Sequence, residues 1–280
     1  MSAATRPART TRRTAAPPAR FRDLLAAEWI KLWSLRSTYG SLAVITVSAL
    51  LFSARAALAD HRNWPDYSAE RRAFFAPVGD AFPEEGWLFV VLAAGSVGAV
   101  MIASEYASGQ IRTTFAAVPA RRAVAAAKVV VLAAVMTAVG ALASGGAFWL
   151  SQAILADRHA GASIADPGAL RAVVASALLV PVCALAGLGI GALVRHTAPA
   201  IVTTTAVLLL LPLAFDTRHR WTAAVNHAQP VPAWERLVEL VPFPNYDGWV
   251  ATIPTSWTVF ATWSLTATLA TLIALHHRDP

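Results

Sequence analysis

Charged residues are scarce in this 280-residue sequence. They make up 14% of the chain, whereas hydrophobic residues make up 56%, and the mean hydropathy is +0.53. A soluble domain usually carries about 25% charged residues because its surface faces water, so a soluble globular protein is disfavoured. The abundance of apolar residues also excludes a disordered chain. Cysteine is nearly absent, and the single Cys183 can form neither an internal disulfide nor a zinc site made of cysteines.

Motifs for enzymatic chemistry are lacking. Only two lysines occur, Lys31 and Lys128, and neither precedes a serine or threonine, so the chain has no P-loop for ATP. The zinc-protease motif is absent, and the glycine-rich segment 187–192 lies in an apolar run without the strand that a dinucleotide site requires. We therefore expect no catalytic residues, no cofactor and no metal site, which disfavours an intramembrane enzyme.

Long apolar runs dominate the rest of the chain. A helix that crosses a hydrocarbon core of about 30 Å needs about 20 mostly apolar residues. A basic tail at 1–20, which we expect to be disordered in the cytoplasm, precedes six such stretches. The stretches are 39–58, 87–103, 128–156, 170–194, 199–215 and 256–276, of which the second and fifth are short and the third is long. The sequence thus predicts an all-α integral membrane protein with one six-span domain over residues 21–280.

The basic residues are distributed unevenly along the chain, which has a net charge of +7. If the N-terminus is cytoplasmic, the inner segments are the tail, the loop at 104–127, the turn at 195–198 and the C-terminus. Lysine and arginine outnumber acidic residues in these segments, whereas acidic residues are in excess outside. This positive-inside pattern predicts an N-in, C-in topology. The basic residues would then contact anionic membrane lipids, and we expect no nucleic-acid partner.

The segment Phe21–Ser37 is predicted to form an amphipathic helix. Its apolar residues recur at steps of three and four, whereas the charged residues, including Glu28 and Lys31, occupy other faces. The helix is too charged to span a membrane and should lie flat on the cytoplasmic interface, where Trp29 and Trp33 favour the boundary. Its simplest role is a generic anchor that leads into the first span.

The segment 104–128 is long for a connection between two spans. Gly109 permits a break, residues 110–118 could form a short helix, and a proline then ends that helix. Two interpretations are open: a basic loop that only fixes topology, or a docking element for a cytoplasmic partner. The residues that we single out in this loop are Glu105, Tyr106, Gly109, Arg112, Pro119 and Arg121.

Three segments, in this order, resemble the permease subunits of ABC-2 type ABC transporters. Ala27–Tyr39 is similar to the family's interfacial elbow helix with its Glu-x-x-Lys pair. Ser104–Lys128 is similar to its loop between spans two and three, and Gly187–Ile201 to its small-residue turn between spans four and five. Within the last segment, Gly187 and Gly191 form a small-xxx-small pair that allows close helix packing.

The resemblance implies a multi-pass subunit of the bacterial plasma membrane. Such a permease pairs with a second copy, most simply as a homodimer, and with a separate P-loop ATP-binding subunit. The loop after span two would hold a coupling helix that docks on the ATPase, and we expect Glu105 and Arg112 to make those contacts. Export is the expected direction of transport. The segment Trp234–Val241 is similar to the half-inserted outer helices of such permeases, although an ordinary interfacial loop would also explain it.

A non-transporting membrane scaffold or sensor is the alternative interpretation. It would use the same loop at 104–127 to hold a cytoplasmic protein, so the two interpretations differ in whether that partner hydrolyses ATP. Because no acidic residue lies inside any span, a self-powered proton- or sodium-coupled carrier is disfavoured. The apolar spans favour a lipid, an apolar peptide or a drug-like compound over a small ion as the substrate.

Overall fold

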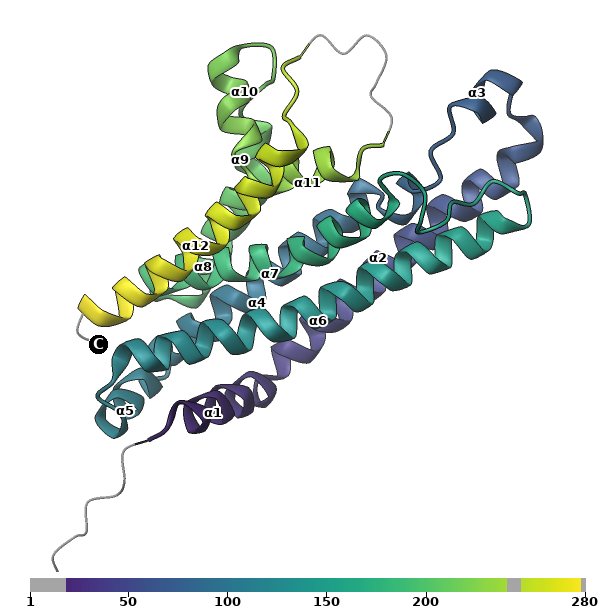
Figure 1. Cartoon of the computed structure of the whole chain (residues 1–280). Coiled ribbons are helices and arrows are strands. Elements are labelled where there is room, and N and C mark those ends of the chain that lie inside the picture. Colours follow the sequence, from purple (N-terminus) through teal and green to yellow (C-terminus); the bar gives the residue numbers. More distant parts are fainter. Residues whose placement is uncertain (1–18, 241–247, 278–280) are drawn as a thin grey trace, which may run out of the picture.

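The computed structural model describes residues 19–240 and 248–277, and every regular element in these residues is helical. Almost all of the tail that we predict to be disordered lies outside the described residues. Within them, five helices are long and apolar enough to cross a membrane, which makes the chain an α-helical membrane protein (Figure 1). These helices are α2 (Arg36–Asn63), α4 (Glu84–Ala107), α6 (Arg121–Ala156), α7 (Ala169–Val194) and α12 (Ile253–His277).

The five long helices coincide with five of the six predicted spans, but α6 starts earlier than expected. We predicted the span from residue 128, with Lys128 at its boundary, whereas α6 begins at Arg121. The intervening residues include four alanines, and alanine is the best helix former. The helix therefore continues through Lys128 and places this residue inside α6, two turns from its start.

The predicted span at 199–215 is a shorter apolar helix, Thr197–Leu213. It combines α8 (Thr197–Thr205), a wider π-helical turn at Ala206–Leu210, and α9 (Leu211–Leu213). Pro212 explains the wider turn, since a proline has no N–H to donate and its ring displaces the carbonyl four residues earlier. At about 1.5 Å per residue, 17 residues extend about 25 Å, somewhat less than a hydrocarbon core of about 30 Å.

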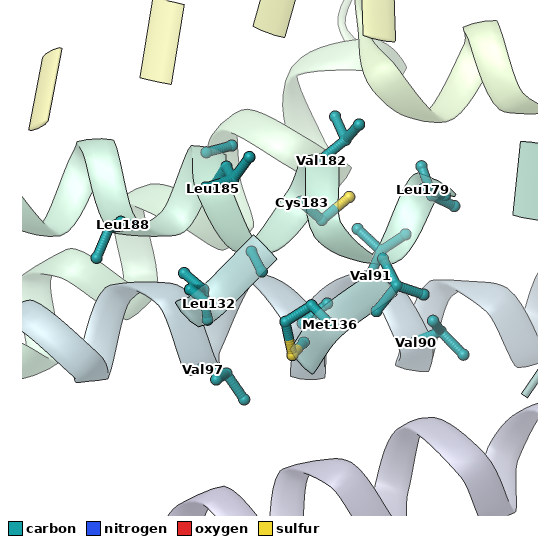
Figure 2. Packing of buried hydrophobic residues seen from close by; sticks show 14 of the residues in the cluster. Val90, Val91, Val97, Leu132, Met136, Leu179, Val182, Cys183, Leu185 and Leu188 are labelled. Carbon is teal, nitrogen blue, oxygen red and sulfur yellow. The ribbon is translucent and has the colours of Figure 1, made fainter. Parts of the chain in front are cut away.

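The core lies where α4, α6 and α7 meet. Figure 2 shows side chains from the three helices packed together, including Val91 from α4, Met136 from α6 and Cys183 from α7. A Cβ atom at Gly98 would lie 1.8 Å from the carbonyl oxygen of Ala184 on α7. Only glycine lets two helix backbones approach so closely, so small residues set the spacing of α4 and α7.

Short helices gather at the two ends of the bundle (Figure 1). One end, here the α5 end, carries α1 (Phe21–Ser34), α5 (Gln110–Ala117) and the last turn of α12. The opposite end, the α11 end, carries α3 (Ala69–Ala73), α10 (Arg220–His227) and α11 (Pro230–Val238).

Helix α11 differs in its bounds from the outer helix that we expected at Trp234–Val241. It begins at Pro230, in keeping with the preference of proline for the first turn of a helix, and ends at Val238. The last predicted residue, Val241, lies outside the described residues. Trp234 is buried and donates a hydrogen bond from Nε1 to Ser176 Oγ of α7 at 2.9 Å. Helix α11 is thus packed into the protein as well as lying at its surface.

Helix α1 does not separate charged and apolar residues as we predicted. Its buried residues are Leu24, Glu28 and Leu32, which are spaced by four and so share one face. Meanwhile Trp29 and Ile30 are exposed. The prediction that Glu28 lies on a different face from the apolar residues was therefore wrong. The carboxylate points into the protein because cations from the same and other helices meet it there.

Candidate functional site

Four charged side chains converge at the α5 end, where α1, α4 and α6 meet. Lys128 Nζ lies 2.5 Å from Glu28 Oε2 and 2.8 Å from Glu105 Oε1. Lys31 Nζ lies 2.8 Å from Glu28 Oε1 and 3.1 Å from Glu105 Oε1. Each ammonium group thus contacts both carboxylates, and the formal charges balance. We call these four residues the ion cluster.

The ion cluster is almost completely buried. Lys128 is 0% exposed, Glu28 2% and Glu105 3%, whereas Lys31 lies at the edge. Burying a single unpaired charge costs several kcal/mol, so each member depends on the opposite charges around it. Both lysines of the chain belong to this cluster. Its charges tie together three helices that are far apart in the sequence.

The charges at the α1 side of the cluster stabilise one another. Burial by itself disfavours the ionised carboxylate of Glu28, but the ammonium groups of Lys128 and Lys31 outweigh this effect and lower the pKa of Glu28. Burial also disfavours the charged form of Lys31, but the carboxylates of Glu105 and Glu28 raise the pKa of Lys31. Both residues are therefore ionised at neutral pH.

Helix α5 is connected to the ion cluster on its inner face. Ile111 and Phe115 are buried, and Thr114 between them accepts a hydrogen bond from Lys31 Nζ at 3.5 Å. Gly109 precedes the helix with a φ of 71°, a left-handed conformation that glycine adopts without strain and that turns the chain from α4 into α5. The helix ends at Ala117, two residues before the proline at 119.

The outer face of α5 is free of the bundle. Arg112, Thr113, Ala116 and Ala117 are all exposed. Arg112 is therefore accessible to another protein, whereas Glu105 is not. We expected Glu105 to contact a partner directly, and this expectation was wrong, because the carboxylate is buried between two ammonium groups. Glu105 acts inside the protein, as a link between α4 and the lysines of α1 and α6.

Two other predicted loop residues form stacking contacts at the same end. The guanidinium of Arg195, at the end of α7, lies 4.9 Å from the ring centroid of Tyr106. The guanidinium of Arg121, at the start of α6, lies 5.1 Å from that of Phe115. Such cation–π contacts contribute about 0.5–2 kcal/mol. They attach the ends of α6 and α7 to the region around α5.

The two predicted tryptophans of α1 have different surroundings. The ring centroid of Trp33 lies 5.6 Å from that of Trp29 and 5.4 Å from that of Tyr39 at the start of α2. Trp33 is partly buried, whereas Trp29 is 48% exposed. Trp33 thus helps to fix the corner between α1 and α2, and Trp29 presents an amphipathic ring to the surroundings, as membrane interfaces favour.

Gly187 and Gly191 lie on the face of α7 that packs against α4. A Cβ at Gly187 would lie 2.0 Å from the carbonyl oxygen of Gly95, and one at Gly191 would lie 2.8 Å from that of Ala99. These glycines therefore allow close helix packing and are separate from the ion cluster.

The sequence did not predict the ion pair between Lys128 and Glu28 or the hydrogen bond between Lys31 and Thr114. One signal was available, because a lysine within an alanine- and valine-rich run is an expensive residue that usually has a buried partner. The spacing of three and four from Ile111 to Thr114 and Phe115 places Thr114 on the apolar face of α5 and Thr113 on the opposite face, but it does not show that Lys31 is the partner of Thr114.

The described residues contain no group of three or more His, Cys, Asp or Glu side chains that could hold a metal ion. The ion cluster itself is fully neutralised by its own charges, so it is suited to joining helices and not to binding a further ion. No protein-family model matches the chain, and no curated protein or solved structure matches it either. The functional interpretation therefore depends on the ion cluster and α5.

Proposed function

We propose that this chain is the transmembrane permease subunit of an ATP-driven ABC-2 type transporter of the bacterial plasma membrane. The observation that carries the proposal is the arrangement of α5. Its outer face is exposed, and its inner face is joined through Thr114 and Lys31 to the ion cluster. A loop that only fixed topology would need no such link. A partner that pushes on α5 can therefore move α1, α4 and α6.

The ion cluster makes this transmission stiff. Removing one member of a buried ion pair costs about 3–5 kcal/mol, because the remaining charge has no partner. Helices α1, α4 and α6 should therefore shift together at this end instead of separating from one another. Within the described residues Glu105 Oε2 is buried and accepts no hydrogen bond, so Lys31 has a second acceptor available if α1 moves relative to α4.

The remaining parts of the proposal follow from the sequence and the helix faces. The chain has no P-loop, so the energy would come from a separate ATPase that binds the α5 end in the cytoplasm. Segment Thr197–Leu213 would serve as the short fifth of six spans. Leu51 of α2 and Leu265 of α12 belong to exposed apolar faces, which leaves room for a second copy of the chain. Closure of the ATPase pair would then open the dimer outward for export.

The test is co-purification of the tagged chain from mild-detergent membranes, followed by an ATPase assay of the complex. We expect a stoichiometric P-loop ATPase. Arg112→Ala, on the exposed face of α5, should reduce stimulated ATP hydrolysis, whereas Arg22→Ala, an exposed arginine on α1, should not. Capture of a stoichiometric protein that does not hydrolyse ATP would instead favour a scaffold or sensor. Equal stimulation in both variants would remove Arg112 from the coupling surface.

A further inference from the structure

A cleft of about 600 Å³ lies at the α11 end, opposite the ion cluster. The start of α4, the helices α10 and α11, and residues 249–251 before α12 line it. Clefts of about 300–1,000 Å³ are typical of small-molecule sites. This cleft plays no part in the contacts of α5, so it calls for a separate explanation.

The charges in the cleft are unbalanced. Among the described lining residues, the carboxylates are Glu84, Glu235 and Glu239, and Arg236 supplies the only arginine or lysine. Arg236 already has two partners. Its guanidinium lies 3.4 Å from Glu239 Oε2 and donates a hydrogen bond to the carbonyl oxygen of Ala251 at 2.8 Å. This leaves Glu84 and Glu235 without a cation in the cleft.

The cleft also has an apolar wall, which contains Pro232, Trp249 and Val250. The backbone N–H of Trp249 donates a hydrogen bond to the Thr217 carbonyl oxygen at 2.9 Å, and the guanidinium of Arg220 lies 5.0 Å from the Trp249 ring centroid. The indole is thus fixed at the cleft, and its ring already accepts one cation. An apolar wall beside two uncompensated carboxylates is suited to a molecule that combines an apolar body with a positive charge.

We infer that this cleft binds an organic cation, with its charged centre between Glu84 and Glu235 and its apolar body against Trp249 and Val250. The binding itself is independent of any ATPase. Only the identification of the ligand as transported cargo depends on the proposed function. In that case an apolar cation, as the substrate class, would occupy the outer end of the translocation path.

Protonation of Glu235 should weaken the binding of a cation in this cleft. Glu235 is exposed to solvent, but partial desolvation by the cleft wall and repulsion by Glu84 raise its pKa to about 7. Burial lowers the pKa of His227, against a smaller opposite effect of a hydrogen bond with the Trp249 backbone, so His227 adds no positive charge at neutral pH. The charged and titratable groups around the cleft are Glu84 from α4, Arg171 from α7, Arg220 and His227 from α10, and Glu235, Arg236 and Glu239 from α11. A bound cation would therefore compete with a proton.

The experiment is equilibrium dialysis of tetraphenylphosphonium against the purified full chain in detergent. Tetraphenylborate, an anion of the same shape, measures binding that depends on apolar contact alone. We expect saturable binding of the cation and none of the anion. Raising the pH from 6 to 8 should strengthen cation binding by up to about tenfold, since the ionised fraction of Glu235 rises by that factor.

Variants of the glutamates test which carboxylates bind the cation. The double variant Glu84→Gln/Glu235→Gln should weaken cation binding at least tenfold, and Glu235→Gln alone should remove the pH dependence. Glu85→Gln is the matched control, because Glu85 is an exposed neighbour outside the cleft lining, and it should bind as the wild type does. Equal binding of the two tetraphenyl ions by the wild type, or unchanged affinity in Glu235→Gln, would overturn the inference. Neither result would affect the co-purification test of the proposed function.

Discussion

The Lys128 ammonium and the Glu28 carboxylate lie 100 residues apart in the chain and 2.5 Å apart in the fold. The contact brings helix α1 against α6, and Glu105 of α4 completes the set of charges. A short helix that otherwise lies at the edge of the bundle is thereby held by buried charge. Several measurable properties should depend on this contact.

Lys128→Met should destabilise the protein strongly. The methionine keeps the apolar stem but leaves Glu28 and Glu105 with only the partly exposed Lys31, and loss of a buried charge partner costs about 3–5 kcal/mol. We expect a clearly lower Tm in detergent than for the matched variant Lys31→Met, in which the fully buried ammonium remains. A Tm for Lys128→Met equal to that of the wild type would show that the ion cluster contributes nothing to stability.

The contribution of Glu28 and Lys31 to stability should be flat between two pH limits. The pKa of Glu28 is lowered from 4.5, so its contribution is complete above pH 4.5 and is lost as the pH falls through the lowered value. The pKa of Lys31 is raised from 10.5, so its contribution is complete below pH 10.5 and is lost as the pH rises through the raised value. The difference in Tm between wild type and Glu28→Gln should be largest between these limits and should shrink in acid. A difference that is constant down to pH 2 would contradict the assignment.

The helices and most of their bounds could be predicted from the sequence because hydropathy is a local property. Five predicted spans coincide with long helices. Hydropathy misplaced the start of α6, because a charged residue was taken to mark the boundary of a span. Lys128 instead lies inside the helix, where its charge is paired. Hydropathy also did not predict the π-helical turn before Pro212 in the fifth apolar segment.

The site was harder to predict because it depends on tertiary contacts. The Glu28 and Lys31 pair could be recognised from its spacing of three, but not the face on which Glu28 lies, since a charged residue was assigned to the outside. Glu105 was expected to lie at a partner surface, whereas its carboxylate is buried between two ammonium groups. Helical spacing places Thr114 on the same face as Ile111 and Phe115, but its contact with Lys31 of α1 is tertiary and could not be predicted from α5 alone.

Thr114→Val should uncouple the proposed partner without preventing its binding. The change removes the acceptor for Lys31 while leaving the exposed face of α5 intact. We expect normal co-purification of the ATPase and stimulated ATP hydrolysis reduced about two- to tenfold, the effect of one hydrogen bond. Thr113→Val is the control, because the Thr113 hydroxyl bonds only to the carbonyl oxygen of Gln110 in its own helix. Equal hydrolysis in the two variants would argue against transmission through Lys31.

Gly98→Ala should force α4 and α7 apart. The new Cβ would lie 1.8 Å from the Ala184 carbonyl oxygen, a backbone atom that cannot move without its helix. We expect a loss of at least about 3 kcal/mol, the upper end of the usual cost of overpacking. Gly145→Ala on α6 is the control, because nothing beyond its chain neighbours and its own helix backbone lies within 4 Å of its Cβ position. That substitution should be neutral or should stabilise the helix by up to about 1 kcal/mol.

Cys183 provides a direct reporter of this separation. It is the only cysteine of the chain and is fully buried in α7, one turn before Gly187. Its rate of modification by a maleimide therefore measures how often the core opens. We expect slow labelling in the wild type and in Gly145→Ala, and labelling at least about tenfold faster in Gly98→Ala, as an opening made easier by about 1.4 kcal/mol or more requires. If Gly98→Ala protected Cys183 as well as the wild type does, the close approach of α4 and α7 would not be what seals the core.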